Sequence, residues 1–266
     1  MNDDVRNIAL GLVASGVSAT AGWFFRTYLW RRQLRRKREF FGLPGGSECL
    51  LVVNQDPSAS GRGVSRHDAF ALLELSALIK ECGAHADIVV HDAFALLELS
   101  ALIKECGAHA DIVVHDAARQ GFGIRTEFCV GGPASNRRTD AHLRSMLPGV
   151  AVNTDFEDAT DGGAFTIGGE SYRLEKGIAE YVLLARLTGP EGGRPVFLAS
   201  GQRGITNQAA VRYLARHHTR LARRHGLDGT FCLLLKVVNS DAYGPDMVEL
   251  VADVTASATA GTVAGR

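Results

Sequence analysis

The sequence predicts an α/β protein: an N-terminal transmembrane helix followed by a three-layer, Rossmann-like, mostly parallel sheet with an added antiparallel hairpin. Three observations predict it. An uncharged apolar stretch runs from Ile8 to Phe25, strand and helix patterns alternate through the body, and a Gly-Gly pair at 168–169 separates two short strand patterns. The predicted divisions are 1–45 (transmembrane anchor and basic juxtamembrane segment), 46–255 (α/β domain) and 256–266 (disordered tail).

The stretch from Ile8 to Phe25 is long enough to cross a bilayer as a helix of about 27 Å. Its end carries a set of aromatic residues typical of a membrane interface: Trp23, Phe24, Phe25, Tyr28 and Trp30. The basic run RRQLRRKR at 31–38 then predicts a single-pass plasma-membrane protein with its N-terminus outside and its C-terminal domain in the cytoplasm. Membrane lipid is therefore a predicted partner of residues 8–38.

Two other interpretations of this segment stay open, a cleaved signal peptide ending near ATA at 19–21 and a soluble core helix. The net negative start MNDDVR disfavours the signal peptide. Small residues at four-residue spacing suggest a homodimer through the transmembrane helix, although a span generally rich in small residues would look the same. The two rows are Gly11, Ser15, Ala19 and Ala14, Ser18, Gly22.

Composition limits the function classes. The chain of 266 residues is 46% hydrophobic, enough for a sizeable core, and its net charge is zero. Residues 1–45 hold eight Arg/Lys against three Asp/Glu, so the remaining chain is mildly acidic and a nucleic-acid partner is not expected. The five cysteines form no CxxC pair and lie in apolar runs, which predicts buried free thiols; neither a metal site nor a cofactor is expected.

The elements of the body can be placed in order from their patterns. The first βαβ unit comprises a strand at 48–54, a helix capped by Asp68 and ending at Glu81, and a strand at 86–90. After it we expect a strand at 126–132, a helix at 135–147, a strand at 150–156, the hairpin around Gly168 and Gly169, strands at 181–188 and 195–201, a helix from Asn207 to His225, and final strands at 230–239 and 247–255.

Residues 67–90 are repeated without change at 91–114. Each copy is a helix-plus-strand unit with six large apolar helix residues, and leaving six such side chains exposed would forgo on the order of 10 kcal/mol. We therefore expect the extra copy to enter the sheet as a further helix and strand; extrusion of one copy is the alternative. Perfect identity indicates a recent duplication or an assembly error, because separately selected repeats diverge.

Two strand ends resemble each other, CVGGPASNRRTDAHL and LASGQRGITNQAAVRYL. Each runs from strand to glycine, then to a hydroxyl-Asn pair, then to a helix, an arrangement that could bind an anion at the helix N-terminus. The predicted ligand-binding residues are Gly131, Gly132, Ser135, Asn136, Arg137, Gly201, Arg203, Thr206 and Asn207. Ordinary well-capped turns are the alternative, and neither sequence is a GxGxxG or P-loop motif.

No catalytic motif is present, and the catalytic residues stay unknown. Carboxylates and a tyrosine that could act near the turns are Asp56, Glu127, Asp241, Tyr243 and Asp246, for which solvated turns are the favoured interpretation. The sequence therefore leans away from an enzyme.

The segments FFGLPGGSECLLVV, RHDAFALLELSALIKECGAHAD, GGPASNRRTDAHL, FLASGQRGITNQAA and LLLKVVNSDAYGPD resemble an uncharacterised family of bacterial membrane-anchored proteins. The resemblance covers nearly all of residues 40–255 and implies a Rossmann-like cytoplasmic domain with one copy of the repeated segment, but no known activity. Our leading hypothesis is a membrane-anchored sensor or regulator whose domain binds a small anionic ligand such as a nucleotide. The alternatives are a membrane-tethered enzyme acting on a nucleotide or phosphorylated substrate, and a structural or interaction protein without a ligand.

Overall fold

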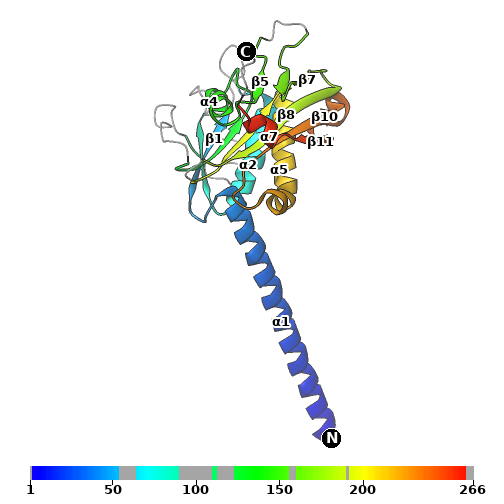
Figure 1. Cartoon of the computed structure of the whole chain (residues 1–266). Coiled ribbons are helices and arrows are strands. Elements are labelled where there is room, and N and C mark those ends of the chain that lie inside the picture. Colours follow the sequence, from blue (N-terminus) through cyan, green and yellow to red (C-terminus); the bar gives the residue numbers. More distant parts are fainter. Residues whose placement is uncertain are drawn as a thin grey trace.

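A computed structural model describes residues 2–53, 64–89, 110–112, 123–155, 160–189 and 192–261, with side chains for all of these except 2–16, 89 and 110–112. A globular α/β body stands at the end of one long projecting helix (Figure 1). The predicted α/β class is confirmed, with a sheet that is mixed rather than mostly parallel.

The long helix α1 (Asn2–Phe41) spans about 60 Å and ends inside the body. Gly42 stops it with φ +61°, a left-handed conformation that favours glycine, and the Leu43 N–H donates to Arg38 O at 2.9 Å. Phe40, Phe41 and Leu43 are fully buried, although they lie on the anchor side of the predicted boundary between 45 and 46. The last turn of α1 is therefore part of the domain core.

Among the residues with described side chains, no helix is both long enough and apolar enough to cross a bilayer. Residues 8–16, the first half of the predicted span, lie outside that set.

Eight strands form the main sheet, in the order β11-β10-β8-β9-β4-β1-β2-β3. Their bounds are β1 Glu48–Val53, β2 His85–Val89, β3 Ala110–Ile112, β4 Thr126–Val130, β8 Ala179–Leu187, β9 Val196–Gly201, β10 Phe231–Val238 and β11 Val248–Asp253. The run from β9 to β3 is parallel, whereas β8, β10 and β11 pair antiparallel.

The prediction of a mostly parallel sheet is thus wrong for the β8–β11 half. Parallel neighbours need a crossover connection of a dozen or more residues. Only residues 188–195 join β8 to β9, and residues 239–247 join β10 to β11, with just the short helices α6 (Ser240–Tyr243) and η2 (Gly244–Asp246) between them. Connections this short can only reverse the chain into an antiparallel neighbour.

Two hydrophobic clusters cover the two faces of the sheet, so the predicted three layers are present (Figure 1). On one face lie α2 (Arg66–Glu81), α5 (Gly204–His225) and the end of α1. On the other face lie α4 (Arg137–Met146), α7 (Thr255–Thr259) and a small antiparallel sheet of β5 (Val150–Val152), β6 (Phe165–Ile167) and β7 (Glu170–Tyr172).

The predicted hairpin is confirmed as β6 and β7, joined by Gly168 and Gly169 at φ +60° and +88°. Two consecutive positive φ angles are what a two-residue turn of right-handed twist requires, and glycine adopts them without strain. The prediction of buried free thiols is also confirmed for the four described cysteines, Cys49, Cys82, Cys129 and Cys232.

Helix starts and the tail differ from the predictions. The cap of α2 is Ser65, whose Oγ accepts the Asp68 N–H at 3.1 Å, and not Asp68. α5 begins at Gly204, three residues before Asn207. The expectation of a disordered tail does not hold for residues 256–260, because α7 forms there and packs the fully buried Ala258 against the sheet.

The second repeat copy contributes strand β3 at the sheet edge. It pairs in parallel with β2 so that identical residues lie opposite each other: Ala86 with Ala110, Asp87 with Asp111 and Ile88 with Ile112. The strand half of the predicted insertion is therefore confirmed. The helix half of the second copy falls in residues outside the described ones.

Candidate functional site

The two predicted glycine turns lie side by side. β4 and β9 are parallel neighbours, so their carboxyl ends reach the same edge of the sheet, and the Gly131 N–H donates to Ala199 O at 2.8 Å. A Cβ on Gly132 would stand only 3.3 Å from Gly201 O, so the glycine permits this close approach. The predicted site drew residues from both turns, and the structure brings the two turns together. Their side chains decide whether they can bind a ligand.

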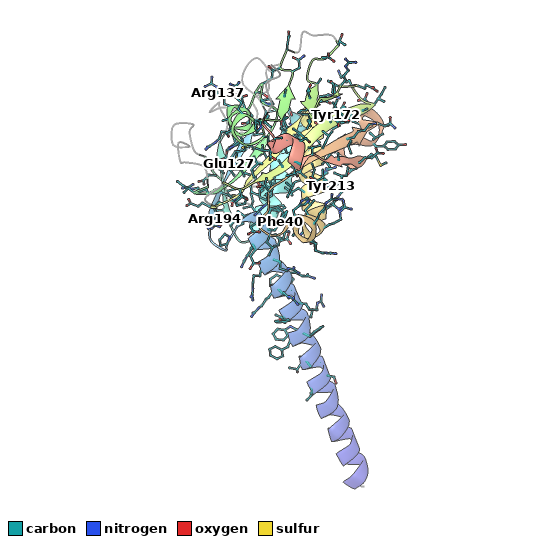
Figure 2. All side chains as sticks on the ribbon, in the orientation of Figure 1. Phe40, Glu127, Arg137, Tyr172, Arg194 and Tyr213 are labelled. Carbon is teal, nitrogen blue, oxygen red and sulfur yellow. The ribbon has the colours of Figure 1, made fainter. Side chains whose placement is uncertain are left out.

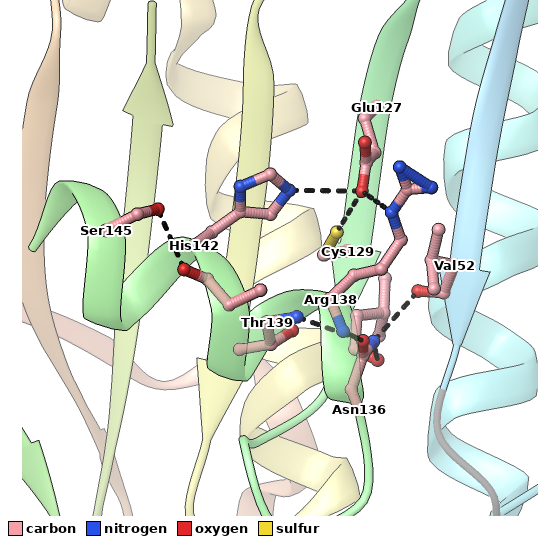
Figure 3. Close-up of polar contacts among 10 residues, drawn as sticks. Val52, Glu127, Cys129, Asn136, Arg138, Thr139, His142 and Ser145 are labelled. Atoms are coloured by element: carbon pink, nitrogen blue, oxygen red, sulfur yellow. Dashed lines mark hydrogen bonds and ion pairs between the residues drawn. The ribbon is translucent and has the colours of Figure 1, made fainter. Parts of the chain in front are cut away.

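Asn136 is used entirely by the fold (Figure 3). It is 1% exposed, and its Oδ1 caps α4 by accepting the N–H groups of Arg138 and Thr139, each at 3.1 Å. Its Nδ2 donates to Val130 O at 3.2 Å and to Val52 O at 3.4 Å. The amide thus joins the start of α4 to the ends of β1 and β4. The hydroxyl of Ser135, the residue before it, is not the cap.

Asn207 and Thr206 have the same kind of structural role in the second turn. The Asn207 Oδ1 accepts the Gly201 N–H at 2.8 Å, and its Nδ2 donates to Asp68 Oδ1 at 2.8 Å, which ties α5 to α2. The Thr206 hydroxyl accepts the Arg203 N–H at 3.2 Å and donates to Arg203 O at 2.7 Å. Both side chains are buried and face protein partners.

The positive charge expected at the turns is largely neutralised within the fold. Arg203 pairs with the fully buried Glu180, and Arg138 Nε lies 2.9 Å from Glu127 Oε1. Arg137 is exposed and points away from the body in Figure 2, and Ser135 is half-buried. Of the predicted site, the exposed arginine and the glycine backbone are therefore the groups most accessible to a ligand.

A buried polar cluster lies behind the first turn, built by β4 and α4 (Figure 3). Glu127 Oε1 accepts a hydrogen bond from the Cys129 thiol at 3.1 Å and lies 3.2 Å from His142 Nε2. The same oxygen forms the ion pair with Arg138. Burial alone would raise the pKa of Glu127, but the hydrogen bond from His142 and the charge of Arg138 outweigh it and hold this pKa below its usual range. Glu127 is therefore a buried carboxylate, not the solvated turn residue that the sequence suggested.

The ligating atoms of Glu127, Cys129 and His142 lie within 4.8 Å of one another, a spacing that a metal ion could bridge. Two features oppose a cation there. The Arg138 guanidinium already occupies the Glu127 oxygen, and burial raises the pKa of the Cys129 thiol well above its usual range, so the thiolate that a metal needs is disfavoured. The cluster fits a structural carboxylate held by hydrogen bonds and an ion pair better than a metal centre.

Three other residues considered for catalysis belong to the α6–η2 segment, which approaches the second turn where the Ser240 hydroxyl donates to Glu180, the partner of Arg203. Asp246 pairs with Arg212 and Arg216 on α5, and Tyr243 is 61% exposed on α6. The Asp241 N–H contacts Gly177 O at 3.5 Å. Asp56 lies outside the described residues.

A cavity of about 790 Å³ opens where α1 enters the domain, and we call it the arginine pocket. Its charged lining residues are Arg35, Arg38, Glu39, Arg186, Arg194 and Asp228. Figure 2 shows Arg194 and Phe40 at this end of the body, beside the base of α1. The sequence signalled only its α1 part, the basic run at 31–38, because the rest comes from distant segments.

A second cavity of about 640 Å³ lies between α1 and the end of α5, with Trp30, Phe40 and His218 in its wall. Both described cavities therefore border the last turns of α1. Comparison of the chain with protein-family models, with curated proteins and with solved structures finds no match.

Proposed function

We propose that the chain is a single-pass membrane protein, anchored by the first part of α1, whose cytoplasmic α/β domain binds a small anionic ligand in a sensor or regulatory role. The observation that carries this proposal is the two-sided character of α1. Its aromatic residues from position 23 to position 30 are mostly exposed, whereas its last turn is built into the domain core.

The exposed aromatic residues of α1 support membrane attachment. Trp23, Phe24, Phe25, Tyr28 and Trp30 are each between 61% and 65% exposed. Five large aromatic side chains on one short stretch of helix are costly in water but typical of the bilayer interface, where their rings lie at the headgroup level. Membrane lipid is the cover that fits them, and the positive-inside rule then puts the domain in the cytoplasm.

The buried end of α1 supports a sensor or regulatory role. Phe40 and Phe41 pack against Phe197 and Phe128, and Arg186 donates to Phe40 O at 3.2 Å. A continuous helix that is packed in this way cannot shift without moving side chains in the sheet core. Membrane anchor and ligand-binding domain would therefore be mechanically coupled.

A charge placed within the predicted span tests the anchor. Val17 is 64% exposed, so Val17→Arg would be nearly neutral if α1 stood in water, whereas an arginine at mid-bilayer costs about 2.5–3.5 kcal/mol. We expect wild-type protein to stay in the membrane pellet after carbonate washing and Val17→Arg to lower that fraction. Gln33→Arg, at an exposed position of α1 within the basic run beyond the span, is the matched control and should behave as wild type.

Release of the wild-type chain by carbonate, or identical behaviour of Val17→Arg and wild type, would contradict the anchor. Labelling of a cysteine introduced at Asn2 by a membrane-impermeant reagent tests orientation. We expect labelling of intact cells; labelling only after lysis would contradict the predicted topology.

A further inference from the structure

We propose that the arginine pocket binds a phosphate-bearing anion, held jointly by α1 and the domain. This inference rests on the proposed function, from which it takes the anionic ligand. It assigns that ligand to the arginine pocket and not to the glycine turns. The pocket combines size, charge and prearranged donors in a way that the turns do not.

Arg186 forms the buried part of the pocket wall. It is 3% exposed, and its guanidinium donates only to neutral groups: Phe40 O at 3.2 Å, Leu227 O at 2.7 Å, Gly229 O at 2.8 Å and the Thr188 hydroxyl at 3.4 Å. Burial lowers its pKa to about 10, so the group is still charged at neutral pH. Buried charges are normally paired, and here the carboxylate that acts on Arg186 is Asp228, which raises its pKa without forming an ion pair with it.

The other arginines add charge that is already positioned. Arg38 Nε donates to Cys82 O at 2.7 Å, and Arg194 Nη1 donates to Gly42 O at 2.6 Å. Arg35 is exposed at the mouth of the pocket. Among the described residues, none of the four arginines forms an ion pair with a carboxylate. Two backbone-held guanidinium groups lose little conformational entropy on binding, which favours affinity.

Net charge and volume both fit a phosphate group. Four arginines against Glu39 and Asp228 leave the lining at +2, a value that a phosphate dianion or pyrophosphate would neutralise. A volume of about 790 Å³ lies within the usual range of small-molecule sites. Planar guanidinium groups bind phosphate oxygens in pairs, so arginine rather than lysine is the expected residue here.

The position of the pocket admits two sources for this phosphate. Arg35 lies ten residues beyond Phe25, about 15 Å along α1 from the end of the predicted span, and five residues beyond Trp30, about 7.5 Å. A lipid headgroup reaching out of the bilayer and a soluble phosphorylated molecule both meet this geometry. Either one would touch α1 at Arg35 and the domain at Arg194, and would thereby bias the position of α1.

The test uses the full chain in nanodiscs with two probes, inorganic pyrophosphate added to phosphatidylcholine discs and phosphatidic acid incorporated into the discs. We expect at least one probe to raise the Tm of the domain. Arg35→Gln should weaken binding roughly fivefold, the loss of about 1 kcal/mol for one exposed contact between opposite charges. Asp228→Asn, which removes a repelling carboxylate, should strengthen binding by a similar factor, and a merely structural role would not produce such a gain.

Arg32→Gln is the matched control, because Arg32 is an exposed arginine of α1 outside the pocket and should leave affinity unchanged. A Tm rise with pyrophosphate alone identifies a soluble ligand, and a rise with phosphatidic acid alone identifies a lipid; either supports the pocket. No rise with either probe, or equal losses for Arg35→Gln and Arg32→Gln, overturns it. If carbonate releases the wild-type chain from the membrane while pyrophosphate still binds, the membrane anchor is rejected and the pocket is retained.

Discussion

Asn136 and Asn207 show how one residue type can serve either a ligand or the fold. Both follow a glycine turn at the start of a helix, where an amide could bind an anion or cap the helix. Each amide here has protein partners at both ends: backbone groups of α4, β1 and β4 for Asn136, and Gly201 with Asp68 for Asn207. The sequence identified two special positions, but the partners that define their role come from other strands and helices.

Asn136→Ala should destabilise the protein by about 2–3 kcal/mol. The substitution removes the cap of α4, worth about 1 kcal/mol, and takes one buried donor away from the carbonyls of Val52 and Val130. Ser135→Ala, the neighbouring predicted ligand residue, should change stability by less than about 0.5 kcal/mol. Urea denaturation followed by circular dichroism measures both, and equal losses would contradict the structural role of Asn136.

The sheet edge formed by β3 shows how the fold accommodates the doubled segment. α2 in the first copy packs Leu72, Leu75 and Ile79 in the core and contacts α5 through the Asn207–Asp68 hydrogen bond. Among the strands that the structure describes, β3 in the second copy pairs with β2 alone. Addition at an edge lengthens a sheet without displacing interior strands, so β4 and β9, which carry the glycine turns, keep their pairing.

Deletion of residues 91–114 should leave the domain folded. The deletion restores the sequence VVHDA at the junction and removes an edge strand that pairs through three residues. We expect the free energy of unfolding to fall by less than about 2 kcal/mol, whereas Leu75→Ala in the buried first copy should cost about 2–5 kcal/mol. Denaturant titration of the deletion variant and of Leu75→Ala measures both losses. A deletion more harmful than Leu75→Ala would show that the second copy supports the core.

At the scale of the whole molecule, the end of α1 and the domain are one packed unit. Phe40 and Phe41 lie among Phe128, Phe197 and Phe231, so the helix end occupies the space that a core element would fill. Gly42 then turns the chain against Pro195. A Cβ at position 42 would lie only 2.4 Å from Cδ of the Pro195 ring. The segment FFGLPGGS thus begins inside the core and is not a free linker.

A chain that begins at residue 46 should not fold, whereas one that begins at residue 31 should unfold cooperatively on heating. The shorter chain lacks Phe40, Phe41 and Leu43, and loss of each buried phenylalanine costs about 3–5 kcal/mol, together comparable with the stability of a whole domain. Circular dichroism melting distinguishes the two. A cooperative transition in the shorter chain would contradict the role of α1 in the core.

The sequence by itself determined the α/β class, the positions of most strands and helices, the Gly-Gly hairpin and the free buried thiols. These features depend on neighbours within a few residues. The tertiary structure alone decided the rest: the direction of β8, the partners of Asn136 and Asn207, the burial of Glu127 and the arginine pocket. Arg35 is far in the sequence from Arg186 and Arg194, and hydrogen-bond partners and local charge depend on which distant side chains the fold brings into contact.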